Sequence, residues 1–356
     1  MKKSLRRSIL LSLVLVCLMI PVMAQKAEVA DYNIWVGTER VTDDHLSGDG
    51  WSFDPDSKTL TLKDAKIDTH AEPNDDDGDT VGNGLIYAKK LDFALTITGS
   101  ADLTAKADDF PMGGIFTEFV DTVILDNAVI QATGDQAGIQ ISDGELIIKG
   151  DKTSINATGL YGSGIKSTNL TIEGGTVDAT AGSGAGIDPE KSFVISGGTV
   201  TATGDNSAFD IVPELKGTFE VTVNENEKWD GTTSLDSDTF KTVQIVAVPT
   251  YTVTWKNADG KVLETDEGVV SGATPEYNGK TPEKAADAQY TYTFAGWDPA
   301  ITAVTGDATY TATYDKTVNE YTITWKNGDD VLKTDDVAYG KTPAFTGTEP
   351  TKEAAG

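Results

Sequence analysis

Residues 170–188 read LTIEGGTVDATAGSGAGID, and residues 193–211 repeat the pattern as FVISGGTVTATGDNSAFDI. Each copy holds an aliphatic-polar-aliphatic run, two glycines, an aliphatic-polar-alanine run and a loop of small polar residues. Side chains on a strand alternate between two faces, so the apolar members of each run point one way and the polar members the other. The repeat therefore predicts short strands that bury one face and expose the other.

The opening phrase of this repeat occurs six times, and its second aliphatic residue marks each copy. The six anchors are Leu62, Ile97, Leu125, Ile148, Ile172 and Ile195. They recur at intervals of 35, 28, 23, 24 and 23 residues, and a second mark, running from Gly84-Leu85 to Ala208-Phe209, keeps a similar period. A unit of this length cannot bury its apolar face alone and must stack on its neighbours. We expect an all-β fold, a single-stranded right-handed parallel β-helix with the six anchors in one inward ladder and glycine pairs at its corners.

The first 24 residues have the pattern of a secretory signal peptide. Lys2, Lys3, Arg6 and Arg7 precede an apolar run, and Val22-Met23-Ala24 supplies small residues for cleavage. Cys17 is the only cysteine, so cleavage after Ala24 leaves no disulfide and no cysteine metal ligand. We expect a secreted or cell-surface bacterial protein that is not inserted in the membrane after the signal is removed.

The composition is strongly acidic. The chain has 28 basic and 56 acidic residues; without the four basic residues of the signal, 24 remain against 56, a net charge of −32. A chain with this charge repels nucleic acid and anionic lipid. Arg40 is the only arginine after residue 24, and His45 and His70 are the only histidines. Few of the usual general bases are therefore available, which favours a protein that is not an enzyme.

Acidic and polar residues recur at the corner that follows the third strand of each predicted coil. If the register is right, they line one edge of the rod, where carboxylate oxygens are ligands that calcium prefers. The metal candidates are Asp75, Asp76, Asp77 and Asp79. The glycan-binding candidates are Asp108, Asp109, Asp135, Tyr161, Asp205 and Asn206. A solvated acidic edge, with Tyr161 only covering its corner, is the alternative interpretation.

Two resemblances add to this interpretation. The segment YNIWVGTERVT (32–42), with GDGWSFDPDSKTLTLKDAKI (48–67) and the GGTVDATA-type coils, resembles the β-helical carbohydrate-binding domain family of clostridial-type surface proteins over about residues 31–247. That resemblance implies a non-catalytic module that binds calcium and acidic polysaccharides such as pectin. From residue 251, YTVTWKN recurs at residue 321 as YTITWKN, and together with FAGW (294–297) it looks like the Listeria–Bacteroides repeat of internalin-type surface proteins, a β-grasp-like module. That resemblance implies a spacer or adhesion module.

The chain is accordingly divided into five parts. Residues 1–24 are the signal peptide, 25–57 an N-terminal β cap, 58–247 the β-helix with its closing strands, 248–318 one β-grasp-like repeat, and 319–356 a second, truncated repeat. Any cell-wall anchor would lie beyond Gly356.

The leading functional interpretation is non-catalytic polysaccharide binding and adhesion, with calcium, on plant cell-wall or host glycans. A structural spacer or protein-binding adhesin is the alternative. A β-helical lyase or hydrolase is disfavoured because the predicted coils contain no arginine and no histidine follows His70.

Overall fold

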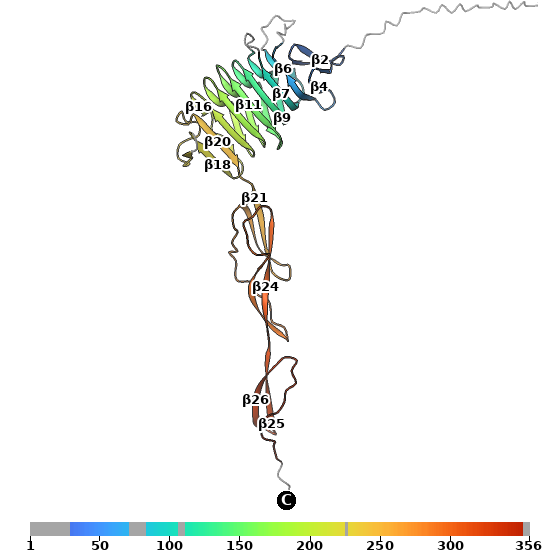
Figure 1. Cartoon of the computed structure of the whole chain (residues 1–356), viewed down its shortest axis with the longest axis vertical. Helices are drawn as coiled ribbons and strands as arrows, with labels where there is room; N and C mark the ends of the chain where they lie inside the picture. Colours follow the sequence, from blue (N-terminus) through green and yellow to red (C-terminus); the bar gives the residue numbers. More distant parts are fainter. Residues whose placement is uncertain (1–28, 71–82, 106–110, 225–226, 352–356) are drawn as a thin grey trace, which may run out of the picture.

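The computed structural model describes residues 29–70, 83–105, 111–224 and 227–351, and all regular structure in these ranges is β-strand. The predicted signal peptide lies outside the described residues. Within those ranges, no helix has the length and apolar character needed to cross a membrane. Strands β1 to β20 form one sheet system, and the strands after residue 249 form separate smaller sheets (Figure 1).

The main body is a coil whose strands stack on three faces. The first face contains β6 (Gly84–Leu91), β8 (Gly113–Val120), β16 (Ser207–Phe209) and the first halves of β10 (Ala137–Lys149), β12 (Ser163–Ile172) and β14 (Ala185–Ile195). The second face contains the second halves of those three strands, the first halves of β5 (Thr59–Lys66), β7 (Leu95–Thr104) and β9 (Thr122–Gly134), and β17 (Glu214–Leu215). The third face contains the ends of β5, β7 and β9, with β11 (Ser154–Gly159), β13 (Thr176–Ala181) and β15 (Thr199–Thr203). Pairing between successive coils is parallel throughout.

The inward ladder has the predicted spacing except at its first member. Ile97, Leu125, Ile148, Ile172 and Ile195 pair in register, and all five are fully buried. The prediction for Leu62 is wrong by two residues, because Leu60 pairs with Ile97 and Leu62 with Gly99. An offset of two residues keeps Leu62 buried on the inward face, so the alternation of apolar and polar residues alone does not reveal it.

The glycine pairs form tight corners. Gly175 and Gly198 have positive φ values of 79° and 82°, which side chains rarely adopt. A Cβ on Gly198 would lie 2.4 Å from the carbonyl oxygen of Gly175 in the coil below. The corners therefore need glycine for conformation and for close stacking.

Antiparallel strands close both ends, so the sheet is mixed rather than purely parallel. At the N-terminal end lie β1 (Asp31–Val36), β2 (Glu39–Thr42), β3 (Ser47–Gly48) and β4 (Trp51–Asp54), with β1 antiparallel to β6 and β4 antiparallel to β5. At the other end, β20 (Thr242–Ala247) pairs antiparallel with β15 and with β18 (Phe219–Val223), which also pairs with β19 (Glu227–Lys228).

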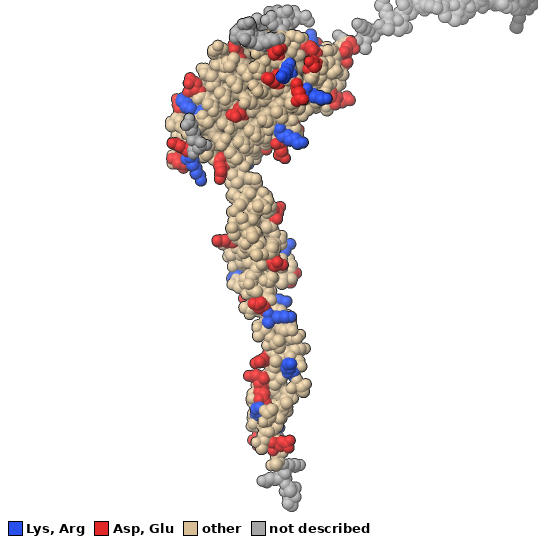
Figure 2. Space-filling model, viewed as in Figure 1, with Lys and Arg blue, Asp and Glu red and all other residues tan. Residues whose placement is uncertain are grey.

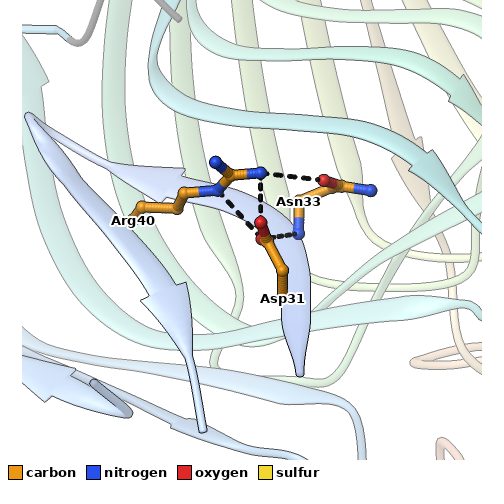
Figure 3. A network of polar contacts seen from close by, with 3 residues as sticks. All are labelled: Asp31, Asn33 and Arg40. Carbon is orange, nitrogen blue, oxygen red and sulfur yellow. Dashed lines mark hydrogen bonds and ion pairs between the residues drawn. The ribbon is translucent and has the colours of Figure 1, made fainter. Parts of the chain in front are cut away.

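Arg40 ties the first hairpin together. Its Nε donates to Asp31 Oδ1 at 2.9 Å, and its Nη2 contacts both the Asp31 carboxylate and Asn33 Oδ1 (Figure 3). Its guanidinium also lies 4.8 Å from the centre of the Trp35 ring. The only arginine after residue 24 therefore has a structural place in this cap.

The C-terminal region has its own core. Strands β22 (Val262–Val270), β21 (Thr250–Lys256), β24 (Ala308–Val318) and β23 (Tyr290–Asp298) form a sheet in that order, with β21 and β24 parallel. Trp255 is fully buried between Tyr277, Trp297 and Tyr310. A hairpin of β25 (Glu320–Asn327) and β26 (Asp330–Ala338) follows, and Figure 1 shows both units extending from the coil as a narrow stalk.

Candidate functional site: a polar groove on the first face

A groove of about 860 Å³ runs over the last four coils of the first face. In each of these coils, one outward side chain directly follows the second periodic mark, which is Gly-Ile in three coils and Ala-Phe in the last. These side chains form the floor of the groove: Gln140, Lys166, Asp188 and Asp210. Gln140 pairs in register with Lys166, and Lys166 with Asp188. The backbone N–H of Asp210 donates to the carbonyl of Ile187, which continues the same row onto the last coil.

A corner of the coil forms one side of the groove. Tyr161, Ser183, Gly184 and Asn206 line this side. The Tyr161 side chain is 74% exposed, so its ring stands free at the rim. An exposed aromatic ring beside a polar floor is suited to a ligand that has both flat apolar faces and hydroxyl groups.

Charged side chains in the groove are partly paired. Lys166 Nζ lies 3.4 Å from Asp188 Oδ2, and the hydroxyl of Ser163 also donates to that oxygen at 3.2 Å. The lining holds two lysines, Lys166 and Lys241, against four aspartates, Asp188, Asp210, Asp236 and Asp238, a formal charge of −2. The groove can therefore donate and accept hydrogen bonds, but its own field is negative.

Ionisation of the Asp210 carboxyl is disfavoured in the groove. Partial shielding from water raises the pKa of its carboxyl above the ordinary value, and the nearby Asp188 carboxylate raises it further. Lys166 acts in the opposite direction, and Asp236 adds to the rise. The folded protein therefore favours the protonated form of Asp210 more than the unfolded chain does.

The last side of the groove lies beyond the final coil. Asp236, Asp238 and Lys241 come from the segment that leads into β20. Backbone N–H groups of Gly204 and Ala208 donate to the carbonyls of Lys241 and Phe240, at 2.9 and 2.8 Å. These bonds hold the segment against the end of the coil.

The sequence-predicted site residues are only partly brought together here. Tyr161 and Asn206 line the groove, whereas its described lining does not include Asp135 or Asp205. The backbone of Asp135 still neighbours that of Tyr161, because the Tyr161 N–H donates to the Asp135 carbonyl at 2.8 Å. The remaining candidates lie outside the described residues: Asp75, Asp76, Asp77, Asp79, Asp108 and Asp109.

Sequence reasoning missed the floor residues. They follow the Gly-Ile mark directly, at one outward position of each coil, so the second periodic mark contained the signal. Asp236, Asp238 and Lys241 lie outside the repeat and had no such signal. Among the residues that the structure describes, no group of three or more His, Cys, Asp or Glu side chains is arranged to hold a metal ion.

Comparison with known proteins adds one result. A family model described as "Beta helix repeat" matches residues 170–188 and 193–208. Of the four floor residues, only Asp188 lies within the matched ranges. The match agrees with the all-β, β-helical character of the chain. No curated protein and no solved structure matches the chain.

Proposed function

We propose that the chain is a secreted or cell-surface, non-catalytic polysaccharide-binding and adhesion protein whose glycan lies in the groove on the first face. The observation that carries this proposal is the row of polar side chains on successive coils, with the exposed Tyr161 ring at its rim. Sugars present hydroxyl groups at their edges and C–H groups on their faces, and the groove offers matching partners for both.

The architecture that we propose for this protein is a single-stranded, right-handed coil that presents the groove, followed by β-grasp-like modules that act as a stalk. Parallel pairing between successive coils and a separate aromatic core around Trp255 support it. A stalk that carries a binding surface away from a cell fits an adhesion role.

A glycan array with purified protein tests the proposal. Tyr161→Ala should weaken binding about tenfold, since it removes a ring that stacks on a sugar face. Leu160→Ala is the matched control, because Leu160 is the exposed neighbour of Tyr161 and is not part of the groove lining. Equal binding by both variants, or no binding to any glycan, would favour the spacer or protein-binding alternative.

Calcium-dependent binding of acidic glycans is the form of this function that the sequence resemblance suggests. The groove itself has an excess of carboxylates, so a uronic acid polymer would need a cation to bridge the two negative surfaces. Running the same array with calcium and with EDTA separates calcium-dependent binding from direct recognition of the glycan. Binding to polygalacturonate that EDTA abolishes supports the calcium form, and EDTA-insensitive binding to neutral glycans supports direct recognition.

The proposal does not include catalysis. Arg40 lies in the cap rather than on a coil, and His45 lies beside Glu39 in the same cap. The incubated glycans should therefore keep their chain length, as measured by reducing-end assays. Measurable cleavage that disappears in Asp188→Asn or Asp210→Asn would replace the binding proposal with a hydrolase.

A further inference from the structure

The outward row on the first face runs parallel to the axis of the coil. Gln140, Lys166, Asp188 and Asp210 occupy one register position on four successive strands. Neighbouring strands are about 4.8 Å apart, and a pyranose unit in an extended chain is of similar length. Successive sugars of an extended glycan would therefore meet equivalent positions on successive coils.

The C-terminal end of this row is blocked. The segment that contains Asp236, Asp238 and Lys241 lies across it, anchored by Leu235 and Phe240, whose side chains are buried in the main core. Lys241 also donates from its ammonium group to the carbonyl of Asn206 on the last coil. This segment forms a wall at the C-terminal end of the groove, where a ligand lying along the row would meet Asp236, Asp238 and Lys241.

The N-terminal end of the row also limits the surface that a ligand can reach. Before Gln140, the same register position holds Phe116, Tyr87 and Trp35. The first two rings stack with centres 5.9 Å apart and are only 2% and 1% exposed. They offer no accessible surface, so the row that a ligand can reach covers the four coils from Gln140 to Asp210.

We infer that the groove binds one terminus of an extended glycan chain, lying along the coil axis with one sugar on each of four coils and its end against the Asp236–Lys241 wall. This inference rests on the proposed function and adds the orientation, the length and the end-specificity of the ligand. At each coil the sugar hydroxyls would meet an amide, an ammonium group or a carboxylate. The terminal sugar would meet Asp236, Asp238 and Lys241.

The length limit can be tested by measuring, with calorimetry, the affinity for oligosaccharides of two to six sugars. The probes are cello-oligosaccharides and, with calcium, oligogalacturonates, both of which extend; malto-oligosaccharides, which coil, serve as the comparison. Affinity should rise with each sugar up to four and then stay constant within about twofold. Affinity that keeps rising from four to six sugars would overturn the inference.

Two variants at opposite ends of the row test the orientation. Gln140→Ala should weaken the tetrasaccharide about tenfold but leave the disaccharide within about twofold of the parent protein, because a two-sugar ligand does not reach that coil. Asp210→Ala should weaken every length. If both variants weaken all lengths equally, the glycan crosses the coil and the inference is wrong. Lys191→Met, on an exposed side chain that does not line the groove, is the control for general effects of charge.

End-specificity has its own test. A bulky fluorophore on one end of the tetrasaccharide should abolish binding, whereas the same label on the other end should be tolerated. Tolerance of both labels would show that the wall does not receive a chain end. If none of the oligosaccharides binds, the proposed function fails and this inference with it; binding without dependence on length or label overturns only the inference.

Discussion

Ile172 shows how strongly a single coil position is constrained. Its side chain is fully buried and pairs in register with Ile148 below and Ile195 above. Ile172→Asp would place an unpaired carboxylate in that ladder, and we expect it to lower the free energy of unfolding by about 4 kcal/mol or to prevent folding. Thr176→Asp, at an exposed position of the same coil, should change it by less than about 0.5 kcal/mol. Similar denaturant midpoints for the two variants would contradict the inward placement.

The stability of the folded protein should depend on pH through Asp210. Its pKa is raised in the folded protein, so ionisation of this carboxyl opposes folding above the pKa of the unfolded chain, and protonation removes that opposition as the pH falls. Asp210→Asn should therefore raise the melting temperature slightly at pH 7, and the difference from the parent should shrink at pH values below the ordinary carboxyl pKa. Asp178→Asn, on an exposed side chain of the third face, is the matched control for net charge. A gain that is equal in both variants and at every pH would mean that Asp210 is not specially placed.

At the scale of elements, two joints separate the coil from the stalk and the stalk units from each other. Asn319, between β24 and β25, donates from its amide group to the Asp287 carbonyl at 2.7 Å and accepts from the Thr291 hydroxyl at 2.7 Å. Its backbone N–H donates to Gln289 and its carbonyl accepts from Tyr339. Val248 and Pro249 form the joint between β20 and β21, where the Val248 N–H donates to the Thr218 carbonyl at 2.8 Å and the Pro249 carbonyl accepts from the Ser271 N–H at 2.9 Å. The joint within the stalk therefore adds side-chain hydrogen bonds of Asn319 to its backbone bonds, whereas Val248 and Pro249 have no side-chain amide to add.

The register of the strands shows how much of the fold the sequence could predict. Periodicity predicted the inward ladder from Ile97 to Ile195, because burial of one strand face leaves a direct trace in the residue pattern. It misplaced Leu62, because an offset of two residues changes the pairing partner without changing the face of the strand on which the side chain lies. The wall of the groove could not be predicted at all. Asp236, Asp238 and Lys241 belong to no repeat, and tertiary contacts bring their segment to the end of the coil: backbone bonds from Gly204 and Ala208, and burial of Leu235 and Phe240 in the main core.

Charge acts at the scale of the whole molecule. The chain has a formal net charge of −28 over its full length, and Figure 2 shows acidic side chains on both the coil and the stalk. Charge spread in this way keeps a long molecule soluble and discourages contact with other acidic surfaces. Salt screens this repulsion, so the association rate of charged ligands should depend on ionic strength.

The whole molecule also contains two separate hydrophobic cores, and this separation predicts how it unfolds. One core extends through the coil and its caps, whereas the other surrounds Trp255 in the stalk. Because apolar burial stabilises each part independently, calorimetry should show two transitions rather than one. Ile172→Asp should lower or abolish the coil transition and leave the stalk transition within about 2 °C, and Trp255→Ala, which leaves a large cavity among Tyr277, Trp297 and Tyr310, should do the reverse. If either variant shifts both transitions together, the coil and the stalk fold as one cooperative unit, and the stalk supports the groove as well as displaying it.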